Sequence, residues 1–309
     1  MSTTTAGRST RSATVVLVGI TAVWGSTFFL VKDVVRELSP ADFLAVRFVL
    51  AAVAMTAVFW RPLRALTRHQ VLVGAGLGGV YAVAQLLQTV GLAHTEASRS
   101  GFITGTYVVM TPLLSAALLR DRVPRSTWAA VGLSALGLAA LSLRGGAASG
   151  LGFGEAVTLA SAGVYALQII GLGRWSYASA AAGLSAMQMI VIAAVCVVAA
   201  VPGGIDLPVG TGAWTSVLYM ALVAGALAIW GQTWAQSHLT ATRAAVVMTL
   251  EPVFAAGFAV ALGGEVLTAR MLLGGALVLA AMYVVELPGR RRDAMVAEDP
   301  PAELLHHEV

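Results

Sequence analysis

The sequence has very little charge for its length. Only 11% of its 309 residues are Asp, Glu, Lys or Arg, whereas 58% are apolar. A soluble domain carries about 25% charged residues, and a soluble chain of this size could not cover its surface with so few. The charges gather between apolar runs of roughly 18–22 residues, enough to cross about 30 Å of hydrocarbon as an α-helix. The composition therefore excludes a soluble protein and predicts an all-α integral membrane protein.

Other absences narrow the function. The single cysteine, Cys196, excludes an internal disulfide. The sequence contains neither a Gly-x-x-x-x-Gly-Lys-Ser/Thr loop nor a His-Glu-x-x-His motif, and its polar segments are too short for an ATPase domain. The net charge of +4 does not indicate nucleic acid, because the arginines lie at the ends of apolar runs, where membrane topology explains them. We expect no cofactor, no metal site and no nucleic-acid partner.

Ten apolar runs separated by short polar segments predict ten transmembrane helices. A segment rich in small residues, 145–153, lies at the middle of the chain and is interpreted as a linker. The expected organisation is a cytoplasmic N-terminal segment (1–12), a first five-helix repeat (13–144), the linker, a second five-helix repeat (154–288) and a disordered cytoplasmic tail (289–309). The expected helices cover residues 13–31, 42–60, 71–92, 98–119, 126–143, 154–173, 182–201, 213–235, 241–262 and 269–287.

The distribution of Lys and Arg predicts the orientation. If the N-terminus is cytoplasmic, the cytoplasmic segments hold thirteen of the nineteen Lys and Arg residues, the outer segments hold five, and Arg47 lies within a helix. Short cytoplasmic loops are enriched in positive charge. We therefore expect a multi-pass protein of the plasma (inner) membrane with both termini in the cytoplasm and the lipid bilayer as its surroundings.

The two halves of the sequence repeat each other. At an offset of 144 residues, Ala97-Ser98-Arg99 corresponds to Ala241-Thr242-Arg243. A five-helix unit crosses the membrane an odd number of times, so the second unit must be inverted relative to the first. Inverted repeats recur in secondary transporters, with the substrate site near the midplane between the halves. Corresponding residues are Gln88/Gln232, His94/His238, Asp121/Glu265 and Tyr107/Glu251, and, at an offset of 141, Trp24/Tyr165 and Thr27/Gln168.

Several strings, in this order and spacing, resemble the EamA family of the drug/metabolite transporter (DMT) superfamily over residues 12–288. They are Trp24-Gly25-Ser26-Thr27-Phe28, Pro40, Arg47-Phe48, Gly91-Leu92, Ala97-Ser98-Arg99-Ser100-Gly101-Phe102-Ile103, Pro112, Leu250-Glu251-Pro252-Val253 and Gly264-Glu265. The resemblance implies that helices 1–4 and 6–9 surround a central cavity, with helices 5 and 10 more peripheral. It also implies alternating access.

The expected function is a secondary transporter, an exporter of small amphipathic metabolites, amino-acid-like compounds or drugs, with proton coupling left open. A facilitative uniporter or importer is the main alternative. A non-transporting sensor and an intramembrane enzyme remain further alternatives, although an enzyme would need several acids, histidines or a nucleophile at one depth, and only Glu251 lies deep in the expected bilayer. The expected partner is a small-molecule substrate, and the sequence leaves monomer or homodimer open.

Polar residues inside the expected helices are the candidates for the cavity lining. Such residues are costly in hydrocarbon and usually face protein or water. Helical spacing puts several of them on common faces, and the repeat carries polar positions of one half onto polar positions of the other. The alternative is that they join helices by structural hydrogen bonds. The candidates are Trp24, Thr27, Tyr81, Gln85, Gln88, Thr104, Tyr107, Thr111, Tyr165, Gln168 and Glu251.

Glu251 is the candidate coupling residue. It lies near the middle of an apolar helix, where a charged side chain costs about 2.5–3.5 kcal/mol on the insertion scale. Burial disfavours the charged form of a carboxyl group, so proton exchange during transport is one interpretation. A structural, protonated carboxyl group beside Pro252 is the other.

Five further residues are assigned expected roles. Pro112 and Pro252 remove backbone hydrogen bonds within helices and are expected hinges, bending at different depths because Pro252 corresponds to Val108 at the offset of 144. Arg99 and Arg243 begin corresponding helices and are expected to flank the gates or to anchor the interface. Arg47 is expected to have a structural role, reaching outward or pairing with Asp42.

Overall fold

The computed structural model describes residues 3–95, 97–120, 123–142, 152–262, 268–269, 272–281 and 283–284, and these residues form helices joined by short turns, with no strand among them. A final helical stretch covers Leu272–Ala281. Short elements extend or interrupt the helices, namely the 3-10 turns η1 (Ala178–Ala180) and η2 (Val201–Gly203) and the π-helical turn η3 (Leu222–Leu227). The α-helices are α1 (Thr3–Gly25), α2 (Thr27–Val34), α3 (Pro40–Val58), α4 (Trp60–Arg64), α5 (Arg68–Ala93), α6 (Ala97–Gly105), α7 (Tyr107–Leu119), α8 (Arg125–Ser142), α9 (Phe153–Trp175), α10 (Ala181–Ala200), α11 (Gly210–Ala221), α12 (Ala228–Gln236), α13 (Ala241–Met248) and α14 (Leu250–Leu262).

Five helical stretches are long and apolar enough to cross a membrane. They are Pro40–Val58, Arg68–Ala93, Phe153–Trp175, Ala178–Gly203 and Gly210–Gln236. Shorter apolar helices cover Thr10–Gly25, Ile103–Leu119 and Leu272–Ala281. The fold is thus all-helical and has membrane-protein character over the described residues, as the apolar runs predicted.

The N-terminal helix begins earlier than expected. It starts at Thr3 instead of residue 13, although its apolar part begins at Thr10. Most of the expected linker and the whole tail 289–309 lie outside the described residues.

Side-chain caps determine where several helices begin. Ser39 Oγ accepts a hydrogen bond from the backbone N–H of Asp42 (3.1 Å) at the start of α3, where Pro40 needs no N–H partner. Thr67 and Gln70 form a capping box at the start of α5. Thr240 Oγ1 accepts from the N–H of Arg243 (3.3 Å) at the start of α13. These caps satisfy N–H groups that the first turn of a helix leaves unpaired.

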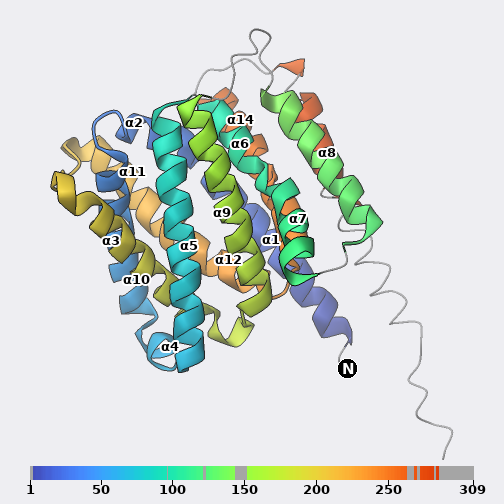
Figure 1. The fold of residues 1–309 in the computed structure, drawn as a ribbon, viewed down its shortest axis with the longest axis horizontal. Coiled ribbons are helices and arrows are strands. Elements are labelled where there is room, and N and C mark those ends of the chain that lie inside the picture. Colours follow the sequence, from blue (N-terminus) through green and yellow to red (C-terminus); the bar gives the residue numbers. More distant parts are fainter. Residues whose placement is uncertain are drawn as a thin grey trace, which may run out of the picture.

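The two repeats pack against each other reciprocally. Their first helices are α1 and α9. The N-terminal α1 packs against α12, α13 and α14, whereas α9 packs against α5, α6 and α7, the corresponding helices of the other repeat. The helices α3 and α10 pack against each other on one side of the bundle, and α8 lies beside the stretch Leu272–Ala281 at the opposite edge (Figure 1). A two-fold relation between the halves requires such a pattern.

Two helices are interrupted near, but not at, the predicted hinge prolines. One falls at Thr106, between α6 and α7, and the other at Thr249, between α13 and α14. The helix α7 continues through Pro112, and Pro252 occupies the first turn of α14, where its missing N–H is tolerated. At the offset of 144, Pro252 corresponds to a position four residues before Pro112. The interruption at Thr249 corresponds to a position only one residue before Thr106. The interruptions thus lie at nearly equal depths in the two repeats, whereas the role of Pro112 and Pro252 as hinges stays a prediction.

Two other irregularities lie beside the centre of the bundle. The first helix breaks at Ser26, between α1 and α2, and the long stretch Gly210–Gln236 contains the π-helical turn η3. A π-helical turn changes the hydrogen-bond register and frees carbonyl oxygens for other donors. Just before the break, Gly25 packs against α14. A Cβ atom at this position would lie 2.8 Å from the backbone oxygen of Glu251, so only glycine allows this approach.

Candidate functional site

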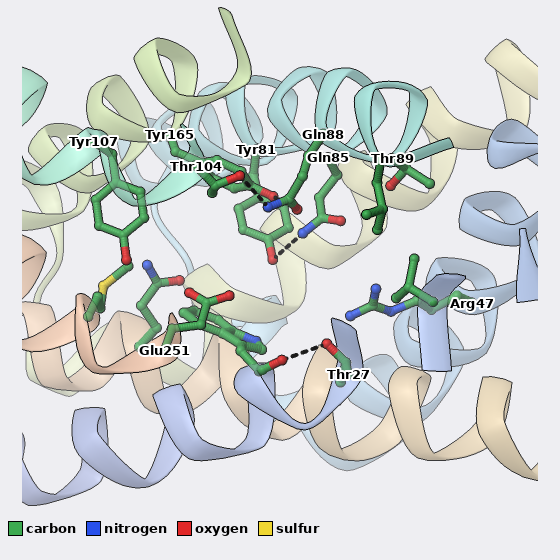
Figure 2. A pocket seen from close by; sticks show the side chains of 15 residues that line it. Thr27, Arg47, Tyr81, Gln85, Gln88, Thr89, Thr104, Tyr107, Tyr165 and Glu251 are labelled. Atoms are coloured by element: carbon green, nitrogen blue, oxygen red, sulfur yellow. Dashed lines mark hydrogen bonds between the residues drawn. The ribbon is translucent and has the colours of Figure 1, made fainter. Parts of the chain in front are cut away.

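A cavity of about 60 Å³ lies among the helices that surround these irregularities. Its lining comes from both repeats, and Figure 2 shows polar side chains directed into it from several helices. Nine of the eleven predicted residues line it, and their roles as substrate ligands stay a prediction. They are Trp24, Thr27, Tyr81, Gln85, Gln88, Thr104, Tyr107, Tyr165 and Glu251.

One wall of the cavity is a hydrogen-bonded network centred on α5. Gln88 Nε2 donates to Thr104 Oγ1 of α6 (3.2 Å), and the hydroxyl of Tyr165 on α9 donates to Gln88 Oε1 (2.9 Å). One turn earlier, Gln85 Nε2 donates to the hydroxyl of Tyr81 (2.9 Å). The rings of Tyr81 and Tyr165 meet edge to face at 5.7 Å. These contacts fix five polar side chains from three helices around one space.

The carbonyl groups near η3 hold two side chains on the other wall. Trp24 Nε1 of α1 donates to the carbonyl oxygen of Ala224 within η3 (3.0 Å). Arg47 Nε of α3 donates to the carbonyl oxygen of Met220 just before η3 (3.0 Å). Because both bonds end at an irregular turn, that turn positions an aromatic and a charged side chain at the cavity.

Glu251 and Tyr107 reach the same cavity, as their correspondence in the repeat predicted. Figure 2 shows both on one side of it. Tyr107 is 3% exposed, and its hydroxyl has no hydrogen-bond partner among the described residues. Glu251 is half-buried in the wall, with no ion-pair partner in the described part of the chain. A carboxyl group and a hydroxyl group are thus available to a molecule inside the cavity.

Thr111 and Gln168 do not line the cavity. The hydroxyl of Thr111 donates to the carbonyl oxygen of Tyr107 in its own helix (2.7 Å). Gln168 is 1% exposed, and its Oε1 lies 3.5 Å from Gln232 Nε2. Gln232 Nε2 also donates to Gln236 Oε1 (3.0 Å), and Gln236 Nε2 donates to the carbonyl oxygen of Ile169 (3.0 Å). Gln168 therefore joins two helices, as its alternative interpretation expected, whereas Thr111 bonds within its own helix.

The sequence interpretation missed six lining residues. Two of them could have been predicted from the sequence, because Gln232 corresponds to the predicted Gln88 and Arg47 is a charged residue inside an apolar helix. Arg47 neither reaches outward nor pairs with Asp42, because it is 4% exposed and its Nε bonds to Met220. The sequence analysis thus expected only a structural role for Arg47, whereas the structure also places it in the cavity wall. The six missed residues are Val31, Arg47, Thr89, Leu92, Gln232 and Met248.

The expected gate-flanking arginines are described only in part. The backbone of Arg99 lies near the start of α6, but its side chain lies outside the described residues. Arg243 is half-buried near the start of α13 and does not line the cavity. Within the described part of the chain, no group of three His, Cys, Asp or Glu residues is placed to hold a metal ion.

The chain is similar to known transporter sequences over nearly its whole length. The model of the EamA-like transporter family matches residues 11–143 and again residues 151–287. An uncharacterized transporter of Archaeoglobus fulgidus is 31% identical over 268 residues, which cover 87% of this chain and 83% of that protein. A chain in a solved crystal structure described only as a protein shares the fold, with a TM-score of 0.74, 18% identity, and coverage of 91% of this chain and 97% of that one. The chain therefore belongs to the EamA-like transporter family of the drug/metabolite transporter superfamily.

Proposed function

We propose that this membrane transporter is a secondary transporter with ten membrane spans in two inverted repeats, and that the central cavity is its substrate site. The expected cargo comprises small amphipathic metabolites, amino-acid-like compounds or drugs, moved outward across the plasma (inner) membrane with both termini in the cytoplasm. The observation that carries this proposal is the position of the described lining residues, which reach the helix ends on one side, because alternating access requires a site that faces one side at a time.

The cavity extends toward the side on which α2 and α5 end. Val31, three residues before the end of α2, and Leu92, next to the end of α5, both line it. In the proposed orientation α5 runs from the cytoplasm outward, so the cavity faces the outside of the cell.

The opposite side is closed by contacts among helix ends of the second repeat. Gln236, the last residue of α12, donates to the carbonyl oxygen of Ile169 on α9 (3.0 Å). Further along α9, a Cβ atom at Gly173 would lie only 3.0 Å from the backbone N of Ala241, which begins α13. The ends of α9, α12 and α13 thus leave little space for a solute. Opening of this side requires these helix ends to separate.

The cavity chemistry suits a small substrate with polar and apolar parts. Aromatic side chains, amide groups, one carboxyl group and one guanidinium group face a common space. A site of this kind, mostly apolar with a few placed polar groups, is typical of small-molecule binding. Glu251 is the proposed coupling residue because it is the only carboxyl group among the described lining residues.

Two measurements test the proposal. Metabolite profiles of deletion and overexpression strains identify compounds whose export depends on the protein. Uptake of those compounds into proteoliposomes, with and without an imposed pH gradient, then measures transport directly. Uptake accelerated by the gradient is expected. Uptake at the same rate with and without the gradient would identify a facilitative uniporter. If the protein supports flux of none of the compounds, the transport proposal is overturned.

A further inference from the structure

Arg47 is a buried cation with no buried anion beside it among the described residues. Its side chain is 4% exposed and lines the cavity. No carboxylate forms an ion pair with it among the residues that the structure describes, and Glu251 projects from the opposite side of the cavity (Figure 2). A buried charge is costly unless it is paired and hydrogen-bonded. The protein supplies only part of what this guanidinium group requires.

The contacts of Arg47 leave most of its donors available. A guanidinium group has five N–H donors, and a single bond, from Nε to the carbonyl oxygen of Met220, accounts for one of them. The rings of Phe43 and Phe48 lie 5.8 and 5.0 Å from the guanidinium carbon and fix its position without accepting a conventional hydrogen bond. Figure 2 shows the guanidinium group directed into the cavity.

The orientation in which the Arg47 guanidinium group is fixed suits an oxyanion. The planar fork of a guanidinium group matches two oxygens of a carboxylate or phosphate. Because the Nε bond and the two rings fix Arg47 in advance, little conformational freedom is lost when an anion binds. The hydroxyl of Thr27 and the amide of Gln85 also line the cavity.

The charge balance of the cavity selects between the two oxyanions. Among the described residues that line the cavity, Arg47 is the only cation and Glu251 is the only acid. When Glu251 is protonated, this one buried cation balances one negative charge, so a carboxylate fits the site better than a phosphate dianion. The volume of about 60 Å³ leaves space for about four to six water-sized groups, which also favours a small molecule.

We propose that Arg47 binds the carboxylate of the transported molecule and thereby selects small monocarboxylates and orients them in the cavity. The carboxylate lies at the side formed by α3, and the part of the molecule that faces Glu251 carries no negative charge. This inference rests on the proposed function of the cavity as a transport site. It assigns Arg47 as a specificity-determining residue, beyond its role in holding the turn before η3.

Ligand binding to the purified protein tests the assignment. Thermal stabilisation is measured with the common amino acids and 2-hydroxy acids, each compared with its own primary amide, which keeps the shape but removes the negative charge. We expect at least one acid to bind the wild-type protein at least tenfold more tightly than its amide. If no acid binds, or if the amides bind as tightly as the acids, the assignment is overturned, and this comparison needs no variant.

Variants separate recognition from a purely structural role. Arg47→Gln should reduce the preference for acid over amide to less than threefold, while amide binding changes little, and Arg47→Lys should retain part of the preference. Arg64→Gln is the matched control, because Arg64 is exposed, stacks on Trp60 and lies outside the cavity. If the folded Arg47→Gln or Arg47→Lys variant loses affinity for acids and for amides by the same factor, Arg47 only supports the fold.

Transport measurements distinguish failure of this inference from failure of the proposed function. Counterflow in proteoliposomes is measured for the same acids and amides. Flux of amides or cations without a preference for acids would overturn the role of Arg47 but leave the transporter proposal intact. Selective binding of acids without any flux would retain the carboxylate site and overturn transport.

Discussion

Thr106 and Thr249 interrupt two helices of the bundle with the same local geometry. The φ and ψ angles are −63° and −13° at Thr106 and −66° and −7° at Thr249. Each backbone N–H and each hydroxyl donates to the carbonyl oxygen three residues earlier, that of Ile103 or Val246. A threonine hydroxyl that bonds back to its own helix competes with the helical pattern. The repeats thus place equivalent interruptions in the two helical segments that carry Tyr107 and Glu251 to the cavity.

The prolines should differ in their effect on transport, because only Pro252 adjoins an interruption. Pro252→Ala supplies an N–H that can bond to the carbonyl oxygen of Met248 and lets the helix continue through Thr249. We expect transport in proteoliposomes to slow by about tenfold, which corresponds to a barrier raised by about 1.4 kcal/mol. Pro112→Ala is the matched control within an uninterrupted helix and should change the rate by less than about threefold. Equal rates for both variants and wild type would exclude Thr249 as a hinge.

Glu251→Gln should abolish transport driven by a pH gradient while the protein still folds. The amide keeps the shape of the carboxyl group but cannot exchange a proton, whereas Glu251→Asp keeps the exchangeable group and should retain part of the activity with a shifted pH optimum. Transport is measured in proteoliposomes at several imposed gradients.

The control for this experiment is Glu37→Gln, which removes an exposed carboxylate outside the cavity. It should respond to the gradient like the wild-type protein. If Glu251→Gln also responds like the wild-type protein, Glu251 is not the coupling residue, and its structural interpretation replaces the proposal.

Cysteine labelling tests the orientation. Arg64 and Asp206 are both exposed, and the native Cys196 is buried, so an impermeant reagent should report only on introduced cysteines. In a Cys196→Ala background, intact cells should label Asp206→Cys at least tenfold faster than Arg64→Cys, because an impermeant reagent does not cross the bilayer. Preferential labelling at position 64 would invert the proposed orientation. Labelling of both positions would contradict the number of spans.

Gly25→Ala should destabilise the protein, because its Cβ atom would overlap the backbone oxygen of Glu251. Overpacking of this kind costs about 1–3 kcal/mol, and we expect a lower midpoint of thermal unfolding. Gly19→Ala is the matched control in the same helix, because no atom lies within 4 Å of its added Cβ. It should leave the midpoint unchanged or raise it, since alanine favours a helix by about 0.8–1.0 kcal/mol over glycine. Equal midpoints for the two variants would show that α1 and α14 can separate without loss of stability.

The sequence predicted the positions of the helices well, because the length of an apolar run directly reflects burial in hydrocarbon. It predicted the irregularities poorly. A proline is visible in a sequence, but its effect depends on whether it lies in the first turn, as Pro252 does, or within a helix that stays regular, as at Pro112. No residue type in the sequence reveals the π-helical turn η3 or the hydrogen bonds that the hydroxyl groups of Thr106 and Thr249 make to their own helices.

The candidate site was predicted where helical spacing and the repeat agreed. Tyr81, Gln85 and Gln88 share one face of α5, and all three line the cavity. Thr111 was misplaced because spacing defines a face but not the partner of a hydroxyl group, which bonds to its own helix. For Arg47, the sequence suggested either an outward orientation or a nearby partner, Asp42. Its acceptor in the structure is the carbonyl oxygen of Met220, which lies 173 residues away.

The reciprocal packing of the repeats has a consequence for biosynthesis. The first helix, α1, ends at Gly25, but the helices that cover it begin at Ala228 and end at Leu262. At a synthesis rate of about 5–20 residues per second, roughly 200 further residues take about 10–40 s to emerge. During this interval Trp24 and Ser26 lack their partners Ala224 and Tyr219. The first repeat must therefore wait in the bilayer with polar groups unsatisfied, at the stage when premature association or degradation most threatens the nascent chain.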